Sequence, residues 1–234
     1  MLSEKEMMER ARAEGRVLLT EIESKELMKG AGINVVGTRL ARSKEEAIEI
    51  SDQIGYPVVL KVVSRQITHK SDAGGVRLGI ATPEETGEAY DQIHRSVSEK
   101  CAEAVIEGVT VQRAARPGIE VIVGMFKDNQ FGPVLMFGLG GIWVEILKDV
   151  SFRIVPLTRK DACSLIREIK GFPLLEGRRG QEGVDLSSLE EVLLKLSAFV
   201  EKYPGIKEID LNPIFAYRDG YLVVDARVIL EPGP

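Results

Sequence analysis

The chain has 234 residues, of which 44% are hydrophobic and 29% charged, and its formal net charge is −5. This composition is typical of a folded protein with one large domain or two lobes. The acidic balance excludes the basic field that would attract nucleic acid or an anionic membrane, and an aromatic content of 6% argues against base-stacking platforms.

The cellular compartment is indicated by the cysteines and by the start of the chain. Cys101 and Cys163 are isolated, with no CxxC motif, which fits a reducing compartment. The chain is charged from Glu4 onward and shows no signal-peptide core. No apolar run approaches the roughly 20 residues of a membrane span. We therefore expect a cytoplasmic protein with no membrane and no nucleic-acid partner.

The first hundred residues alternate helices with short apolar strands, a pattern typical of an α/β unit. Helix starts are marked by hydroxyl residues, as in the capping box Thr20-Glu-Ile-Glu23 and in Thr82-Pro83, where proline takes the first helical position. His94 is assigned to the surface or to helix packing. We expect helices over residues 3–14, 21–29, 44–54 and 83–100, and strands over 33–37, 57–63 and 76–80.

The rest of the chain favours strands, then a long helix, then a hairpin. Asp128-Asn129 supplies one turn and Asp219-Gly220 the hairpin turn. Ser187-Ser188 is expected to cap the long helix, and residues 171–186, rich in glycine and arginine, are expected to form a loop or a partner-contact segment. We expect strands over residues 108–113, 119–127, 133–137, 152–157, 208–215 and 221–228, and helices over 159–170 and 189–202.

The stretch from Lys61 to Gly75 carries the strongest chemical signal. Lys61 lies inside a β-branched strand, and because an unpaired buried lysine is costly, it should meet an anion. A polar loop with His69 follows, and then the pair Gly74-Gly75. A fixed cation and closely approaching backbone N–H groups are what a phosphate cradle needs. The sequence thus predicts phosphate handling, although a lone loop histidine is also compatible with a structural role.

A second glycine segment, Gly138-Leu-Gly-Gly-Ile-Trp143, nearly matches a dinucleotide fingerprint. Trp143 stands where glycine or alanine is required, which excludes a Rossmann site, and no Walker A sequence exists. The glycines remain suited to close backbone approach near a phosphate or a metal, with Glu145 and Asp149 just beyond them. Glu145 is a candidate catalytic carboxylate; the alternative is a solvated acidic turn.

The terminal hairpin predicts a metal site. Alternation places Glu208, Asp210 and Asn212 on one face of a strand, and Asp225 interrupts the apolar strand that follows. Mg²⁺ takes oxygen ligands, usually one or two from protein together with nucleotide phosphates. Asn212 and Asp225 on paired strands would suit it, and the alternative is a structural pair that satisfies the turn backbone.

Two further residues are candidates for nucleotide binding. Gln112 ends one strand and Glu120 begins the next. A carboxylate at this position is able to hold the hydroxyl pair of a ribose, while Gln112 reaches an adenine edge. An edge-strand salt bridge would explain Glu120 equally well.

Taken together, these elements resemble an ATP-grasp protein, specifically the nucleotide-binding β-type subunit of ADP-forming acetyl-CoA synthetases, a family related to the succinyl-CoA synthetase β subunit. The resemblance runs from about Leu19 to Arg227. Its carriers are Leu19-Thr-Glu-Ile-Glu-Ser-Lys-Glu-Leu, Lys61-Val-Val-Ser with His69-Lys-Ser-Asp-Ala-Gly-Gly-Val, Gln112-Arg-Ala-Ala-Arg-Pro-Gly-Ile-Glu120, Gly138-Leu-Gly-Gly-Ile-Trp-Val-Glu145, and Glu208-Ile-Asp-Leu-Asn212-Pro with Asp225.

The resemblance implies an ATP-grasp fold, an α/β (α+β) domain over residues 1–234 with two interwoven lobes and the nucleotide between them. The expected lobes are residues 20–110, with the phosphate and histidine loop, and residues 1–19 plus 111–234, with the metal hairpin. It further implies that ADP or ATP is bound by Lys61, Gly74, Gly75, Gln112 and Glu120, that Mg²⁺ is held by Asn212 and Asp225, and that His69 is phosphorylated.

In that family, the phosphohistidine relays a phosphoryl group between a histidine of the partner subunit and ADP. CoA binding and acyl-phosphate chemistry belong to an α-type subunit or fused domain, so this chain is expected to be half of an enzyme, in an α2β2 hetero-oligomer. The reaction would convert acyl-CoA, ADP and phosphate reversibly into acid, CoA and ATP. The alternatives are a stand-alone ATP-grasp carboxylate ligase and a non-catalytic nucleotide-sensing subunit.

Overall fold

The computed structural model describes residues 2–67, 70–141, 148–177 and 182–233. The chain forms two compact units, a larger one of Met1–Val35 and Pro117–Pro234 and a smaller one of Val36–Arg116. Residues 111–116 were expected in the second lobe, but the smaller unit extends to Arg116. Residues 20–35 were expected in the first lobe, but in the structure they belong to the larger unit. The reason is that α2 (Glu21–Gly30) packs against β10 (Ala226–Leu230). No described helix is both long and apolar enough to cross a bilayer.

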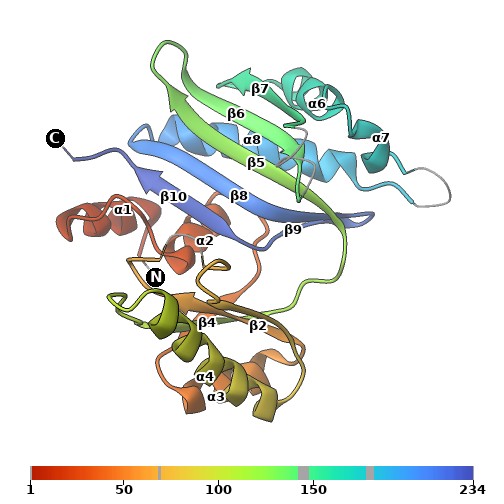
Figure 1. Ribbon diagram of the computed structural model, residues 1–234. Helices are drawn as coiled ribbons and strands as arrows, with labels where there is room; N and C mark the ends of the chain where they lie inside the picture. The colour runs from red at the N-terminus through yellow and green to blue at the C-terminus, as the bar shows by residue number, and fades with distance from the viewer. Residues whose placement is uncertain (1, 68–69, 142–147, 178–181, 234) are drawn as a thin grey trace. The chain divides into compact units, whose positions relative to one another are not determined.

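The smaller unit is an antiparallel four-stranded sheet with two helices. The strand order is β1-β4-β2-β3, and α3 and α4 lie on one face of the sheet (Figure 1). Ser43 and Thr82 cap the two helices, as the sequence predicts. The elements are β1 (Thr38–Ala41), α3 (Lys44–Ile54), β2 (Val58–Val63), β3 (Val76–Ile80), α4 (Pro83–Lys100) and β4 (Gly108–Arg113).

The larger unit is built on a six-stranded antiparallel sheet. Its order is β10-β8-β5-β6-β7, with β9 paired to β8. The strands are β5 (Ile119–Asp128), β6 (Gly132–Leu139), β7 (Val150–Ile154), β8 (Ile206–Tyr217), β9 (Gly220–Val223) and β10. The helices are α1 (Glu4–Ala13), α2, α6 (Arg159–Arg167), α7 (Phe172–Leu175) and α8 (Leu186–Lys202). The capping box predicted at Thr20 is confirmed at the start of α2, and Ser3 forms a second capping box at the start of α1.

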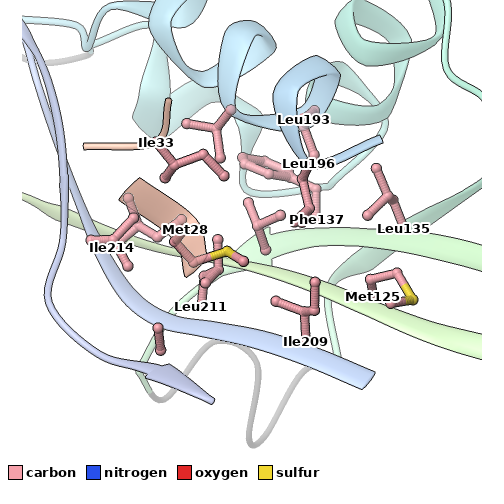
Figure 2. Packing of buried hydrophobic residues seen from close by; sticks show 14 of the residues in the cluster. Met28, Ile33, Met125, Leu135, Phe137, Leu193, Leu196, Ile209, Leu211 and Ile214 are labelled. Carbon is pink, nitrogen blue, oxygen red and sulfur yellow. The ribbon is translucent and has the colours of Figure 1, made fainter. Parts of the chain in front are cut away.

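The core of the larger unit lies between this sheet and its helices. Figure 2 shows Leu193 and Leu196 of α8 beside Phe137 of β6, with side chains of β5 and β8 completing the layer. The side chains that recur at helical spacing along one face of α8 are all buried: Leu189, Val192, Leu193, Leu196 and Val200. Each such side chain contributes roughly 1.5–3 kcal/mol of transfer free energy.

Several predicted boundaries are wrong. Residues 33–37 form no strand; Val35 makes one isolated bridge to Val223, and the ladder begins only at β1. The strand expected at 152–157 is β7, which lies earlier in the chain, and residues 171–186 contain the short helix α7. The cap of α8 is Asp185, whose carboxylate accepts the Ser188 N–H, so the helix begins before the predicted serine pair.

Candidate functional site

The smaller sheet carries a polar patch on the face turned away from α3 and α4. Along β2 the side chains of Val58, Leu60 and Val62 enter the helix-side core, so Lys61 lies on the opposite face. Lys61 pairs with Thr110 of β4, and Gln112 is the diagonal neighbour of Lys61. Diagonal neighbours lie roughly 7–8 Å apart. The side chains of Lys61 and Gln112 are buried, with 6% and 1% exposure.

Gln112 also has a cross-strand partner on β1. Thr38 stands opposite Gln112, and the Thr38 hydroxyl lies 3.3 Å from Gln112 Oε1. The structure therefore brings together Lys61, which the sequence proposed as a phosphate contact, and Gln112, which it proposed separately as a contact to the base. A cation and an amide side by side on a buried face are suited to bind the phosphate end and the base of one nucleotide.

The glycine pair after the histidine loop has a structural task. Gly74 adopts a φ of 70°, and its N–H donates to Ser71 O at 2.9 Å. The Gly75 N–H donates to Lys70 O at 2.7 Å, and a Cβ at Gly75 would collide with Val62. Both N–H groups thus serve the turn itself, so the predicted phosphate contacts of Gly74 and Gly75 would have to come from another arrangement of this loop.

The C-terminal root of the loop is anchored on α4. The Arg77 guanidinium donates to the carbonyl oxygen of Gly74 at 2.9 Å and to the Ser96 hydroxyl at 3.2 Å. Lys100 Nζ donates to Asp72 O at 2.9 Å. His69 itself lies outside the described residues. The other histidine, His94, stacks on Tyr90 with ring centroids 4.4 Å apart, and burial lowers the pKa of His94, which fits the predicted packing role.

Glu120 stands at the start of β5, beside the second glycine segment. The Gly140 N–H donates to Glu120 O at 2.7 Å, and a Cβ on Gly140 would lie 2.9 Å from Glu120 Cβ. A Cβ on Gly141 would lie 3.5 Å from Glu120 Oε2. The glycines predicted to approach a phosphate or a metal thus approach the proposed ribose carboxylate.

The acidic residues beyond the glycine segment are only partly described. Glu145 lies outside the described residues, so its catalytic role stays a prediction. Asp149 is buried, and its carboxylate accepts the backbone N–H groups of Lys170 and Gly171 at 2.7 and 2.6 Å. This carboxylate holds the turn before α7, which is a structural role.

The predicted metal pair lies where the second hairpin strand is interrupted. The hairpin continues as β9 and then β10, with Val224 and Asp225 between them. Leu211 pairs with Ala226 and Ile214 with Val223, so Asn212 stands opposite Asp225. The carboxylate of Asp225 already accepts the Ala226 N–H at 2.9 Å. Two oxygen-bearing side chains opposite each other fit the small protein share of a Mg²⁺ site.

Further charges line the same face of the larger sheet. Burial raises the pKa of Asp210, Arg227 opposes that effect, and Glu208 and Asp225 add to it. Arg227, which the sequence reasoning missed, pairs with Asp210 across the strands and donates to Glu208 Oε1 at 2.5 Å. The sequence feature that would have identified Arg227 is a single cationic residue within an otherwise apolar strand. The described residues contain no group of three His, Cys, Asp or Glu side chains that would hold a metal alone.

Comparison with known proteins identifies close relatives. A family model described as an ATP-grasp domain matches residues 10–230. The sequence is 51% identical over 226 residues to the ADP-forming acetate–CoA ligase I subunit beta of Pyrococcus furiosus, with 97% of each chain covered. It is also 45% identical over 204 residues to ADP-forming acetate–CoA ligase I of Archaeoglobus fulgidus. That match covers 87% of this chain but only 30% of the longer Archaeoglobus protein.

Solved structures give the same picture. The dinucleotide-forming acetyl-coenzyme A synthetase 1 of Candidatus Korarchaeum cryptofilum, in complex with coenzyme A, Ca-AMPCP and HgCl⁺, superposes with a TM-score of 0.95 at 46% identity, covering 98% of this chain and 100% of that one. A second structure of that enzyme, with coenzyme A and Mg-AMPPCP, has its phosphohistidine segment pointing towards the nucleotide binding site; its TM-score is 0.87 at 43% identity, covering 98% of this chain and 100% of that one.

Proposed function

The chain belongs to the ATP-grasp family, and from that membership we propose that it is the nucleotide-binding β subunit of an ADP-forming acyl-CoA synthetase. The ATP-grasp fold expected from the sequence is confirmed. The observation that carries the proposal is the match to a protein named as a β subunit, at 51% identity with 97% of both chains covered. Acetate is the acid in that relative's name, and acetyl-CoA is the acyl-CoA we propose here.

A partner follows from the same relatives. The β subunit of the Pyrococcus furiosus enzyme is named as one subunit, while the Archaeoglobus fulgidus ligase carries the matching region as 30% of a longer chain. The additional chain in such fused relatives is where we place CoA binding and acyl-phosphate formation. We propose that this chain assembles with a CoA-binding α-type subunit, as an α2β2 complex.

Five of the candidate residues receive a part in binding Mg-ADP or Mg-ATP. Lys61, buried on its polar face, neutralises phosphate charge, and its diagonal neighbour Gln112 contacts the base. Glu120 binds the ribose hydroxyls, because a carboxylate accepts hydrogen bonds from both. Asn212 and Asp225, which stand opposite each other in the strand register, would hold Mg²⁺ through their side-chain oxygens. When bound there, Mg²⁺ would neutralise phosphate charge.

His69 carries the transfer in this proposal. A neutral imidazole is nucleophilic near pH 7. One ring nitrogen of His69 attacks the γ-phosphorus of ATP; the N–P bond forms as the bond from the γ-phosphorus to the bridging oxygen breaks, and ADP leaves with that electron pair. The reverse step makes ATP. Lys61 stabilises the phosphoryl oxygens through charge, the contribution on which phosphoryl transfer depends most.

Expression of the chain with and without its partner tests the proposal. Alone, the chain should bind ADP and ATP in the presence of Mg²⁺ but make no ATP from acetyl-CoA, ADP and phosphate. With a CoA-binding subunit, ATP should form, and native mass spectrometry should show two copies of each subunit. Turnover by the chain alone would favour a stand-alone ligase, while nucleotide binding without turnover in the assembled complex would favour a sensing subunit.

A further inference from the structure

The glycine segment at the end of β6 has no part in the function proposed so far. Each of its glycines answers a different constraint. A Cβ on Gly138 would lie 2.8 Å from Val150 Cγ1, so this glycine allows β7 to pair closely. Gly141 has a φ of 62°, a left-handed conformation that favours glycine. Gly140 is the remaining case, because its φ lies outside the left-handed range, so backbone conformation does not explain why glycine stands there.

The nearest obstacles to a side chain at Gly140 belong to Glu120. The three atoms nearest to a Cβ on Gly140 are Glu120 Cβ at 2.9 Å, Glu120 C at 3.3 Å and Glu120 O at 3.4 Å. The same backbone is fixed from the other side, since the Gly140 N–H donates to Glu120 O at 2.7 Å. A side chain at position 140 would press on Cβ of Glu120 and change the direction of its Cα–Cβ bond, which determines where the carboxylate lies. The hydrogen bond from the Gly140 N–H to Glu120 O prevents the two backbone segments from moving apart.

We propose that Gly140 is a positioning residue for the ribose site: it leaves the space in which the Glu120 side chain is aimed at the 2′- and 3′-hydroxyl groups of the nucleotide. This inference rests on the proposed function, in which Glu120 binds ribose. A rotation at the root of a glutamate side chain displaces its carboxylate oxygens much further than its Cβ. Gly140 therefore controls ribose recognition without touching the nucleotide.

The test compares ADP with 2′,3′-dideoxy-ADP by calorimetry on the assembled complex with Mg²⁺. Gly140→Ala should weaken ADP binding about tenfold, the size of a lost hydrogen bond to a charged group. Binding of 2′,3′-dideoxy-ADP should change less than about twofold, because that ligand has no hydroxyl pair to lose. In a Glu120→Ala background, Gly140→Ala should leave the ratio of the two affinities unchanged.

Gly205→Ala is the matched control. A Cβ on Gly205 would crowd Arg12, in the same unit as Glu120. This variant therefore adds the same methyl group without pressing on Glu120, and the ratio of the affinities for ADP and 2′,3′-dideoxy-ADP should not change. A wild-type complex that does not bind ADP would refute the proposed function and this inference with it. A wild-type complex that prefers ADP, together with a Gly140→Ala variant that keeps the same preference, would refute only the role of Gly140.

If Gly140→Ala does not fold, the exchange variant Glu120→Gly/Gly140→Ala decides the question. It moves the single Cβ from one side of the contact to the other, so it should fold and show the low ADP preference of Glu120→Ala. Failure of the exchange variant to fold would show that something other than the contact with Glu120 requires glycine at position 140, which overturns the inference.

Discussion

The carboxylate of Asp149 accepts the backbone N–H of Gly171 at 2.6 Å, and with its second oxygen it accepts the Lys170 N–H at 2.7 Å. Removing the carboxylate leaves two N–H groups without an acceptor in a partly buried place. Asp149→Ala should therefore lower the free energy of unfolding by about 3 kcal/mol, and Asp149→Asn, which keeps one acceptor, by roughly half of that. Denaturant unfolding measures both. The Mg²⁺ dependence of nucleotide binding should not change; if it does, Asp149 belongs to the metal site after all.

Asp210 should make the stability depend on pH in a particular direction. Burial raises its pKa above the ordinary value of 3.8, so the folded state binds this proton more tightly than the unfolded state. As pH rises through the ordinary pKa toward the raised one, the folded state loses stability, and above the raised pKa the loss is constant. Asp210→Asn should therefore gain stability relative to wild type across that window and hold the gain at neutral pH.

Asp128 is the control with the opposite sign. The N–H groups of Gln130 and Phe131 lower the pKa of the Asp128 carboxyl. Its stabilising contribution is present above the ordinary pKa and is lost as pH falls through the lowered one. Asp128→Asn should thus be less stable than wild type at neutral pH, with the difference fading in acid. Melting temperatures of wild type and both variants, measured from pH 3 to pH 8, test the Asp210 and Asp128 predictions. The difference from wild type should change with pH in opposite directions for the two variants. A change in the same direction would contradict the two opposite pKa shifts.

The proposed metal pair predicts a selective loss of Mg²⁺-dependent affinity. Asp225→Asn removes the one negative charge of the pair, and Asn212→Ala removes its amide oxygen. Each should weaken Mg-ADP binding by about tenfold or more, as loss of metal-site residues commonly does. Binding of ADP without Mg²⁺ should change little. The control is Asp128→Asn, which removes a carboxylate from a turn of the same unit. Metal dependence that persists in both variants would leave this part of the hairpin a structural feature.

Local signals in the sequence predicted most elements well. The starts of α1 to α4 follow from Ser3, Thr20, Ser43 and Thr82, because a cap is a contact within three residues. The same rule failed at α8, where Asp185 competes with the serines next to it and begins the helix earlier. The β-branched run at residues 33–37 failed for another reason: a strand needs a neighbour, and this segment has one bridge only.

The placement of the candidate site residues was predictable where it depends on local sequence. Lys61 is buried in an apolar strand, as its neighbours in the sequence indicate, and strand alternation placed Asn212 on the same face as Glu208 and Asp210. The contact between Glu120 and Gly140 was not predictable, because only the register of β5 and β6 brings the two residues together. The phosphate contacts of the glycine pair after the histidine loop stay a prediction; that its N–H groups donate within a turn packed on Val62 follows only from the folded loop.

Phosphorylation of His69 tests the central claim most directly. The chain should be incubated with Mg-ATP labelled in the γ-phosphate, and the protein-bound label examined for stability in acid and base. A phosphohistidine is acid-labile and base-stable. The label should appear in wild type and in His94→Ala, the variant of the only other histidine, and should be absent from His69→Ala, while His69→Asn still binds nucleotide. An unlabelled wild type, or a labelled and fully active His69→Ala complex, would contradict the relay.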